Sequence, residues 1–90
     1  SLNKLVDYML SGKPIIGSYN GYKTMINESG CGEYIMPYDS LALVKTILKY
    51  QNMSYEERIN IGGKGKKWIL KNRSYDKLSD YFSEIILNKT

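Results

Sequence analysis

The first seventeen residues, SLNKLVDYMLSGKPIIG (residues 1–17), contain the signals for a helix, a stop and a strand in that order. At about 100° per residue, four polar side chains fall within a sector of roughly 100°, and apolar side chains surround the rest of the helix. The polar line consists of Asn3, Lys4, Asp7 and Ser11. We predict a helix over residues 3–11 that is buried on most sides, with Ser1 or Asn3 as its N-cap and Gly12 as its left-handed stop.

Strands and helices alternate after this first helix. Pro14 prevents its continuation, and the short apolar run over residues 15–17 is typical of a buried strand in a parallel sheet. Residues 22–29 are predicted to form a short helix, and residues 33–36 a second short strand. Alternation with short glycine-containing connections indicates a parallel sheet that is covered by helices.

The pattern becomes purely helical after residue 39. One helix is predicted from a cap at Asp39 or Ser40, because apolar residues recur there at helical spacing. These residues are Leu41, Val44, Ile47 and Leu48. Ser54 followed by Glu57 is a capping box that opens a further helix.

That further helix is expected to reach about residue 71, and a last helix is predicted from Ser74. The inward stripe of the last helix comprises Tyr75, Leu78, Phe82, Ile85 and Ile86. The expected fold class is therefore α/β, with short parallel strands, flanking helices and a helical C-terminus. A two-stranded parallel sheet has two exposed edges and cannot bury its faces by itself. The chain is therefore predicted to be one partial domain over residues 1–90, the C-terminal half of a Rossmann-like, doubly wound domain.

Composition limits the classes of function. An apolar fraction of 42% is typical of a folded domain, and we find neither a membrane-spanning run nor a signal peptide, so the expected location is the cytoplasm. Cys31 is the single cysteine and histidine is absent, which excludes a Cys-His nucleophile or a histidine-based metal site built from this chain alone. A net charge of +4 favours anionic partners, namely nucleic acid, acidic lipid or a phosphate-bearing substrate.

The first helix carries the candidate site. In a parallel α/β sheet, ligands bind at the carboxyl ends of the strands, where helix N-termini present free N–H groups. The amides of Asn3, Lys4 and Leu5 are predicted to face a diphosphate there. Side chains lean toward the helix N-terminus, so Asp7 is placed to accept hydrogen bonds from a ribose. The simpler alternative, which spacing alone favours, is a solvated ion pair between Lys4 and Asp7.

The run over residues 1–17 resembles the signature S-P-N-K-L-x-D/E-Y-M-A-x-G-K-P-I-I of bacterial retaining glycosyltransferases with the GT-B fold (family 4-like, group 1). The similarity continues through E-S-G-C-G-E-Y-I-M-P-Y-D, M-S-Y-E-E-R and N-R-S-Y-D-K-L, and covers nearly all ninety residues in order. The resemblance implies that the chain is the C-terminal part of the donor-nucleotide-binding domain of such an enzyme.

The resemblance also implies roles for particular residues. In that family two acidic residues separated by seven others flank the donor, and Asp7 falls at the second position, on the nucleotide ribose. The first acid would lie upstream of Ser1. The loop amides that hold the donor diphosphate correspond to those around Asn3 and Lys4. The chain departs from the pattern in two ways, since Leu2 replaces the usual proline and Asp7 is shorter than the commoner glutamate.

By the same resemblance, the activity is transfer of a sugar from a nucleotide-sugar donor to an acceptor sugar or lipid-linked saccharide, in bacterial surface polysaccharide biosynthesis. No cofactor, metal or nucleic acid is expected. Lysines of residues 64–71 would hold the enzyme at an anionic membrane surface, peripheral to its inner face, if they face the lipid. The ninety residues alone are expected to be inactive and to self-associate. The alternative is a non-catalytic α/β module that binds nucleic acid or protein.

The stretch GGKGKKW at residues 62–68 is rich in glycine and lysine, as phosphate-binding loops are. It lacks the spacing of a phosphate-binding loop and no strand precedes it. We expect its glycines to allow close packing, its lysines to be solvated and Trp68 to turn inward. The alternative is a basic patch with an aromatic residue that serves nucleic acid.

Overall fold

The computed structural model describes residues 2–72, with side chains from residue 4 onward. It is a small, mostly helical α/β structure, as the sequence predicted. Its elements in chain order are α1 (Leu2–Leu10), β1 (Ile15–Gly17), the 3-10 turn η1 (Asn20–Tyr22), α2 (Lys23–Ser29), β2 (Gly32–Tyr34), α3 (Ser40–Asn52) and α4 (Tyr55–Asn72). The helix predicted from Ser74 lies outside the described residues.

The two strands form a parallel pair, which confirms the predicted sheet type. Ile15 lies opposite Gly32, and Gly17 lies opposite Tyr34. The N–H of Ile15 donates to the carbonyl of Cys31 over 3.0 Å, and the carbonyl of Gly17 accepts from the N–H of Ile35 over 2.8 Å. The second strand begins one residue earlier than predicted, because Gly32 pairs with Ile15. It ends two residues earlier than predicted, because β1 ends at Gly17, the partner of Tyr34.

Helix ends follow the predicted local signals. Gly12 and Gly30 take left-handed conformations, with φ of 74° and 72°, after α1 and α2. The Asp39 side chain accepts from the N–H of Ala42 over 3.0 Å and caps α3. The Ser54 hydroxyl accepts from the N–H of Glu57 over 3.1 Å at the start of α4. These caps confirm the predicted helix starts.

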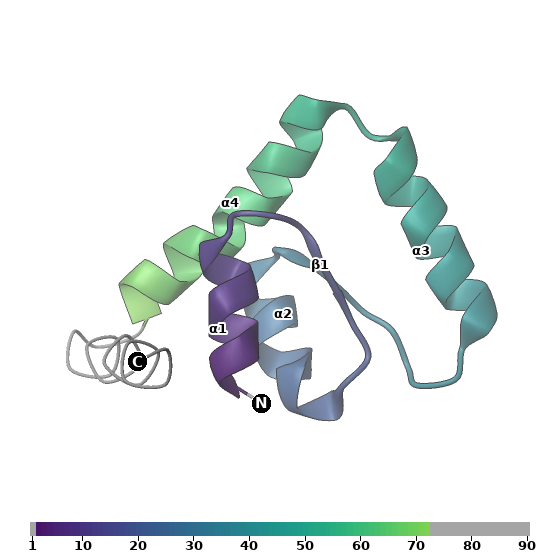
Figure 1. The fold of residues 1–90 in the computed structure, drawn as a ribbon, viewed down its shortest axis with the longest axis horizontal. Coiled ribbons are helices and arrows are strands. Elements are labelled where there is room, and N and C mark those ends of the chain that lie inside the picture. The colour runs from purple at the N-terminus through teal and green to yellow at the C-terminus, as the bar shows by residue number, and fades with distance from the viewer. Residues whose placement is uncertain (1, 73–90) are drawn as a thin grey trace, which may run out of the picture.

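The core lies between α1, α2, α4 and the sheet. Its buried members are Leu5, Val6, Met9, Ile15, Met25, Ile26, Cys31 and Ile69. Trp68 is half-buried against this cluster, as predicted. The prediction that α1 is buried on most sides was too strong, because Tyr8 is exposed and only the side carrying Leu5 and Met9 is fully enclosed. Figure 1 shows α4 crossing α1, with which it is in contact.

Two glycines allow α4 to approach the rest of the chain. A Cβ atom added at Gly62 would overlap the carbonyl oxygen of Gly12, and one added at Gly65 would lie 2.8 Å from the Cβ atom of Cys31. A Cβ atom at Gly63 would meet nothing within 4 Å. The close-packing interpretation of this stretch is therefore confirmed for Gly62 and Gly65.

Helix α3 stands apart from this core (Figure 1). Its periodic apolar residues Leu41, Val44, Ile47 and Leu48 are 48–65% exposed. Its C-terminal half is attached through the buried residues Thr46 and Tyr50. The helix thus presents an apolar face that no described residue covers. Among residues 2–72, no helix is long and apolar enough to cross a membrane.

We predict opposite effects for two alanine substitutions on α4. Gly65→Ala is expected to lower the free energy of unfolding by about 1–3 kcal/mol, because the added methyl group overpacks the contact with Cys31. Gly63→Ala is expected to raise it by up to about 1 kcal/mol, because alanine is the better helix former and the site is open. Urea unfolding of both variants measures the difference. Equal stability of the two variants would contradict the packing argument.

Candidate functional site

The N-terminus of α1 lies at the carboxyl edge of the sheet. The loop over residues 11–14 joins the end of α1 to the start of β1, so the helix runs against the strand. The turn η1 follows the end of β1 and contacts α1. In Figure 1 the N-terminal end of α1 accordingly lies beside the start of α2. This is the edge at which parallel α/β folds bind ligands.

The structure places the four predicted donor-binding residues in the first two turns of α1. Asn3 and Lys4 belong to the first turn, where backbone N–H groups have no acceptor within the helix. Leu5 is the fourth residue of α1, because the helix begins one residue earlier than predicted, so its N–H makes the first hydrogen bond within the helix. Its side chain is fully buried, so Leu5 offers a ligand no free group. Lys4 and Asp7 are both exposed. Asp7 lies on the side of the helix opposite Leu5 and Met9.

The simpler alternative, an ion pair between Lys4 and Asp7, is not observed among the described side chains. Across the part of the chain whose side chains are described, the ion pair found joins Lys49 to Glu33, with 3.3 Å between Nζ and Oε1. Lys4 and Asp7 therefore remain available to a ligand at the edge of the sheet.

An aromatic loop lies at the same edge. The rings of Tyr19 and Tyr22 meet edge to face, with centroids 5.0 Å apart and an interplanar angle of 84°. The ammonium group of Lys23 lies 5.5 Å from the centroid of the Tyr34 ring. Tyr19 is 61% exposed, so one aromatic face is open to solvent. This loop directly follows the end of β1.

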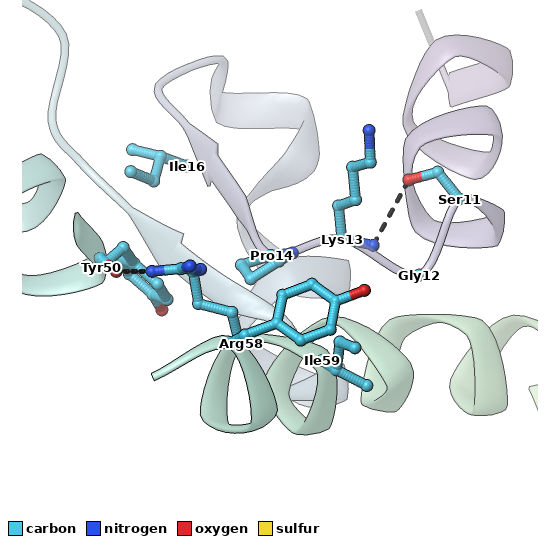
Figure 2. A pocket seen from close by; sticks show the side chains of 9 residues that line it. Ser11, Gly12, Lys13, Pro14, Ile16, Tyr50, Arg58 and Ile59 are labelled. Carbon is cyan, nitrogen blue, oxygen red and sulfur yellow. Dashed lines mark hydrogen bonds between the residues drawn. The ribbon is translucent and has the colours of Figure 1, made fainter. Parts of the chain in front are cut away.

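A cavity of about 700 Å³ opens at the other, amino edge of the sheet. It is lined by Ser11, Gly12, Lys13, Pro14, Ile16, Tyr50, Tyr55, Arg58 and Ile59. Figure 2 shows the Arg58 side chain reaching toward Tyr50, whereas Lys13 points away from Arg58. No local motif predicted this cavity, because it forms only where the corner between α3 and α4 meets the loop before β1.

Arg58 holds the corner together. One terminal nitrogen of its guanidinium group donates to the carbonyls of Tyr50 and Met53, over 3.0 and 2.8 Å. These carbonyls belong to the C-terminal end of α3, which carries the negative end of the helix dipole. An anion in the cavity would face this negative end. The cavity is therefore a poor site for a diphosphate, and it does not coincide with the candidate site on α1.

Tyr50 has a perturbed acidity at this corner. Burial, together with the negative charge of Glu33 nearby, raises the pKa of Tyr50 to about 12. The same burial keeps its side chain only 9% exposed. The shift marks the buried position where the C-terminal half of α3 meets the rest of the chain.

No metal site is found in the described part of the chain, where no three His, Cys, Asp or Glu side chains gather around a common point. Comparisons with protein-family models, with curated proteins and with solved structures found no match to this chain. The resemblance to glycosyltransferases therefore rests on the quoted motifs.

We predict that Tyr50 makes stability depend on pH in the alkaline range. Its pKa is raised in the folded state, so the stabilisation is fully present below pH 10 and is lost as the pH rises through about 12. Between pH 10 and pH 12, the free energy of unfolding of the wild type, measured with urea, should fall by about 2 kcal/mol more than that of Tyr50→Phe. The exposed Tyr55→Phe is the matched control and should follow the wild type. Parallel curves for wild type and Tyr50→Phe would contradict the assignment.

Proposed function

We propose that this chain is the donor-binding part of a retaining, nucleotide-sugar-dependent glycosyltransferase of the GT-B type. The observation that carries the proposal is the position of the α1 N-terminus at the carboxyl edge of a parallel sheet, with Asp7 exposed one turn along. The motif resemblance supports the same assignment, because it assigns the nucleotide ribose to Asp7.

In this proposal each group has a distinct task. The free N–H groups of the first turn, together with the Lys4 ammonium group, bind the donor diphosphate. The Asp7 carboxylate accepts hydrogen bonds from the ribose hydroxyls, which it can do without approaching the phosphates. The open face of Tyr19 supplies an aromatic border next to the nucleotide.

Transfer itself needs groups beyond these. The reacting carbon of the donor and the acceptor hydroxyl must be held about 3–3.5 Å apart in a cleft from which water is excluded. A single carboxylate and a helix terminus position the nucleotide, and they cannot by themselves stabilise an oxocarbenium-like transition state. The proposal therefore assigns donor binding to this chain and assigns the acid near the transferred sugar and the acceptor groups to other parts of the protein.

The proposed acceptor is a sugar or a lipid-linked saccharide of a bacterial surface polysaccharide, which places the enzyme in the cytoplasm at the inner face of the membrane. A second candidate, a non-catalytic module that binds another protein, is favoured by one observation. The apolar face of α3 is exposed, and such a face marks a contact surface. A panel of nucleotide sugars separates the two, because only the transferase is expected to bind a member of the panel.

We predict that Asp7→Ala in the intact protein weakens nucleotide-sugar binding by about 1–3 kcal/mol, which is the cost of a lost hydrogen bond to a charged group. Ser11→Ala is the matched control, because Ser11 continues the same polar line but lies beyond the C-terminal end of α1. Isothermal calorimetry measures the affinity of both variants for the nucleotide sugar of the panel that binds the wild type. Unchanged affinity of Asp7→Ala would refute the ribose contact, and an equal loss in Ser11→Ala would refute its specificity.

A further inference from the structure

Three lysines form a row along one side of α4. Lys64, Lys67 and Lys71 are spaced by three and four residues, so they lie on one face of the helix, and all three are exposed. We call them the lysine row. Helix α4 contains no acidic residue after Glu57, and the exposed acid of α2, Glu28, forms no ion pair with the row. Among the described residues, the row is therefore a positive surface without a paired counter-charge.

A shallow groove of about 400 Å³ runs along this row. It is lined by Ser29, Lys64, Lys67, Trp68, Lys71 and Asn72. The Ser29 hydroxyl accepts from the N–H of Cys31 over 3.3 Å. The Asn72 amide donates to the carbonyl of Trp68 over 2.9 Å. The uncharged polar side chains of the groove are thus bonded to the protein's own backbone, and the lysines remain to meet a ligand. Recognition here is by charge and not by a specific pattern of hydrogen bonds.

Trp68 distinguishes between the anionic ligands that such a row can bind. It packs against the core and is half-buried, while part of its indole ring lines the groove. A ring held in this way is a poor platform for a nucleic-acid base, because stacking needs an open face. An indole with its apolar body buried and one edge open is typical of a membrane–water interface.

The shape of the row also suits a flat anionic surface. At 1.5 Å per residue, the row from Lys64 to Lys71 spans about 10 Å along one straight helix face. Its three ammonium groups can therefore meet the headgroups of one lipid leaflet at the same time. Trp68 is the apolar side chain among the described residues that line the groove, so the contact stays at the level of the headgroups.

We propose that the lysine row, together with the open edge of Trp68, is the surface by which this protein contacts an anionic lipid leaflet. The ammonium groups lie among the lipid phosphates, and the indole edge lies at the headgroup level. This inference deepens the proposed function and rests on it, because it names the surface through which the transferase reaches a lipid-linked acceptor. It assigns no lipid contact to the carboxyl edge of the sheet, so lipid binding and donor binding can be tested separately.

Vesicle binding by the whole ninety-residue chain tests the proposal. Phosphatidylcholine vesicles that contain phosphatidylglycerol should bind the protein, and vesicles of phosphatidylcholine alone should not. Combined Lys64→Gln, Lys67→Gln and Lys71→Gln should weaken binding about 100-fold, because each ammonium group contributes about fivefold. Glutamine is nearly as good a helix former as lysine, so α4 should stay folded. Equal binding to the two kinds of vesicle would overturn the proposal.

A matched triple variant separates the row from net charge. Lys13, Lys23 and Lys45 are exposed and lie on other parts of the chain. Their combined replacement by glutamine removes the same charge and should weaken binding less than about threefold in about 0.1 M salt, where charges are screened beyond about 10 Å. An equal loss in the two triple variants would show that net charge binds the lipid, and the proposal would fail.

Trp68 reports which face touches the lipid, because the chain has no other tryptophan. Its fluorescence emission should shift to shorter wavelength when vesicles with phosphatidylglycerol are added. Lipids with brominated acyl chains should quench it. Vesicle binding without either change would show that another face is used, which would overturn the proposal.

Oligothymidylate tests the competing ligand. At an equal concentration of phosphate it should not displace the protein from the anionic vesicles. Displacement that the lysine-row variant no longer shows would assign the row to nucleic acid and would overturn the proposal.

Nucleotide-sugar binding keeps this inference distinct from the proposed function. The lysine-row variant should bind a nucleotide sugar as tightly as the unaltered chain does. A chain that binds nucleotide sugar but no vesicles would overturn this inference alone. A chain that binds vesicles through the row but no nucleotide sugar would support the lipid surface and overturn the proposed function.

Discussion

The described structure depends on the close approach of α4 to the chain around it. Gly62 faces the carbonyl of Gly12, and Gly65 faces Cys31, which precedes β2. A side chain at either position would separate α4 from the loop before β1 and from the start of β2. Because α1 ends in that same loop, the contact also fixes the direction of α1 and hence the position of its N-terminus. The glycines cost helix propensity and are retained where packing requires them.

The same arrangement explains why α3 is the least packed helix. The core is complete with α1, α2, α4 and two strands, and α3 approaches it only through Thr46, Tyr50 and the ion pair from Lys49 to Glu33. Arg58 then fixes the end of α3 to the start of α4. An exposed apolar face of this kind is typical of a contact surface.

Sequence reasoning succeeded where a local signal determines a local conformation. Gly12, Gly30, Asp39 and Ser54 act within one turn, and the structure places a helix boundary at each. It was less successful where the outcome depends on distant residues. The periodicity of α3 shows that one face is apolar but cannot show what covers it, and the end of β2 was misplaced because its partner strand stops at Gly17. The helix that carries the candidate site residues was predicted from its local pattern, whereas the cavity at the α3–α4 corner had no signal in the sequence.

The two edges of the sheet have opposite electrostatic character. Helices α1 and α3 both run from the carboxyl edge to the amino edge, because α1 precedes β1 and α3 follows β2. Their positive ends therefore point to the carboxyl edge, and their negative ends border the cavity at the amino edge. Arg58 and Lys13, the two cations that line the cavity, offset those negative ends, so their presence does not indicate an anion site. At the carboxyl edge Lys4 adds a positive charge to the α1 N-terminus, where dipole and side chain act in the same direction. These helix ends support the proposal that a diphosphate binds at the carboxyl edge.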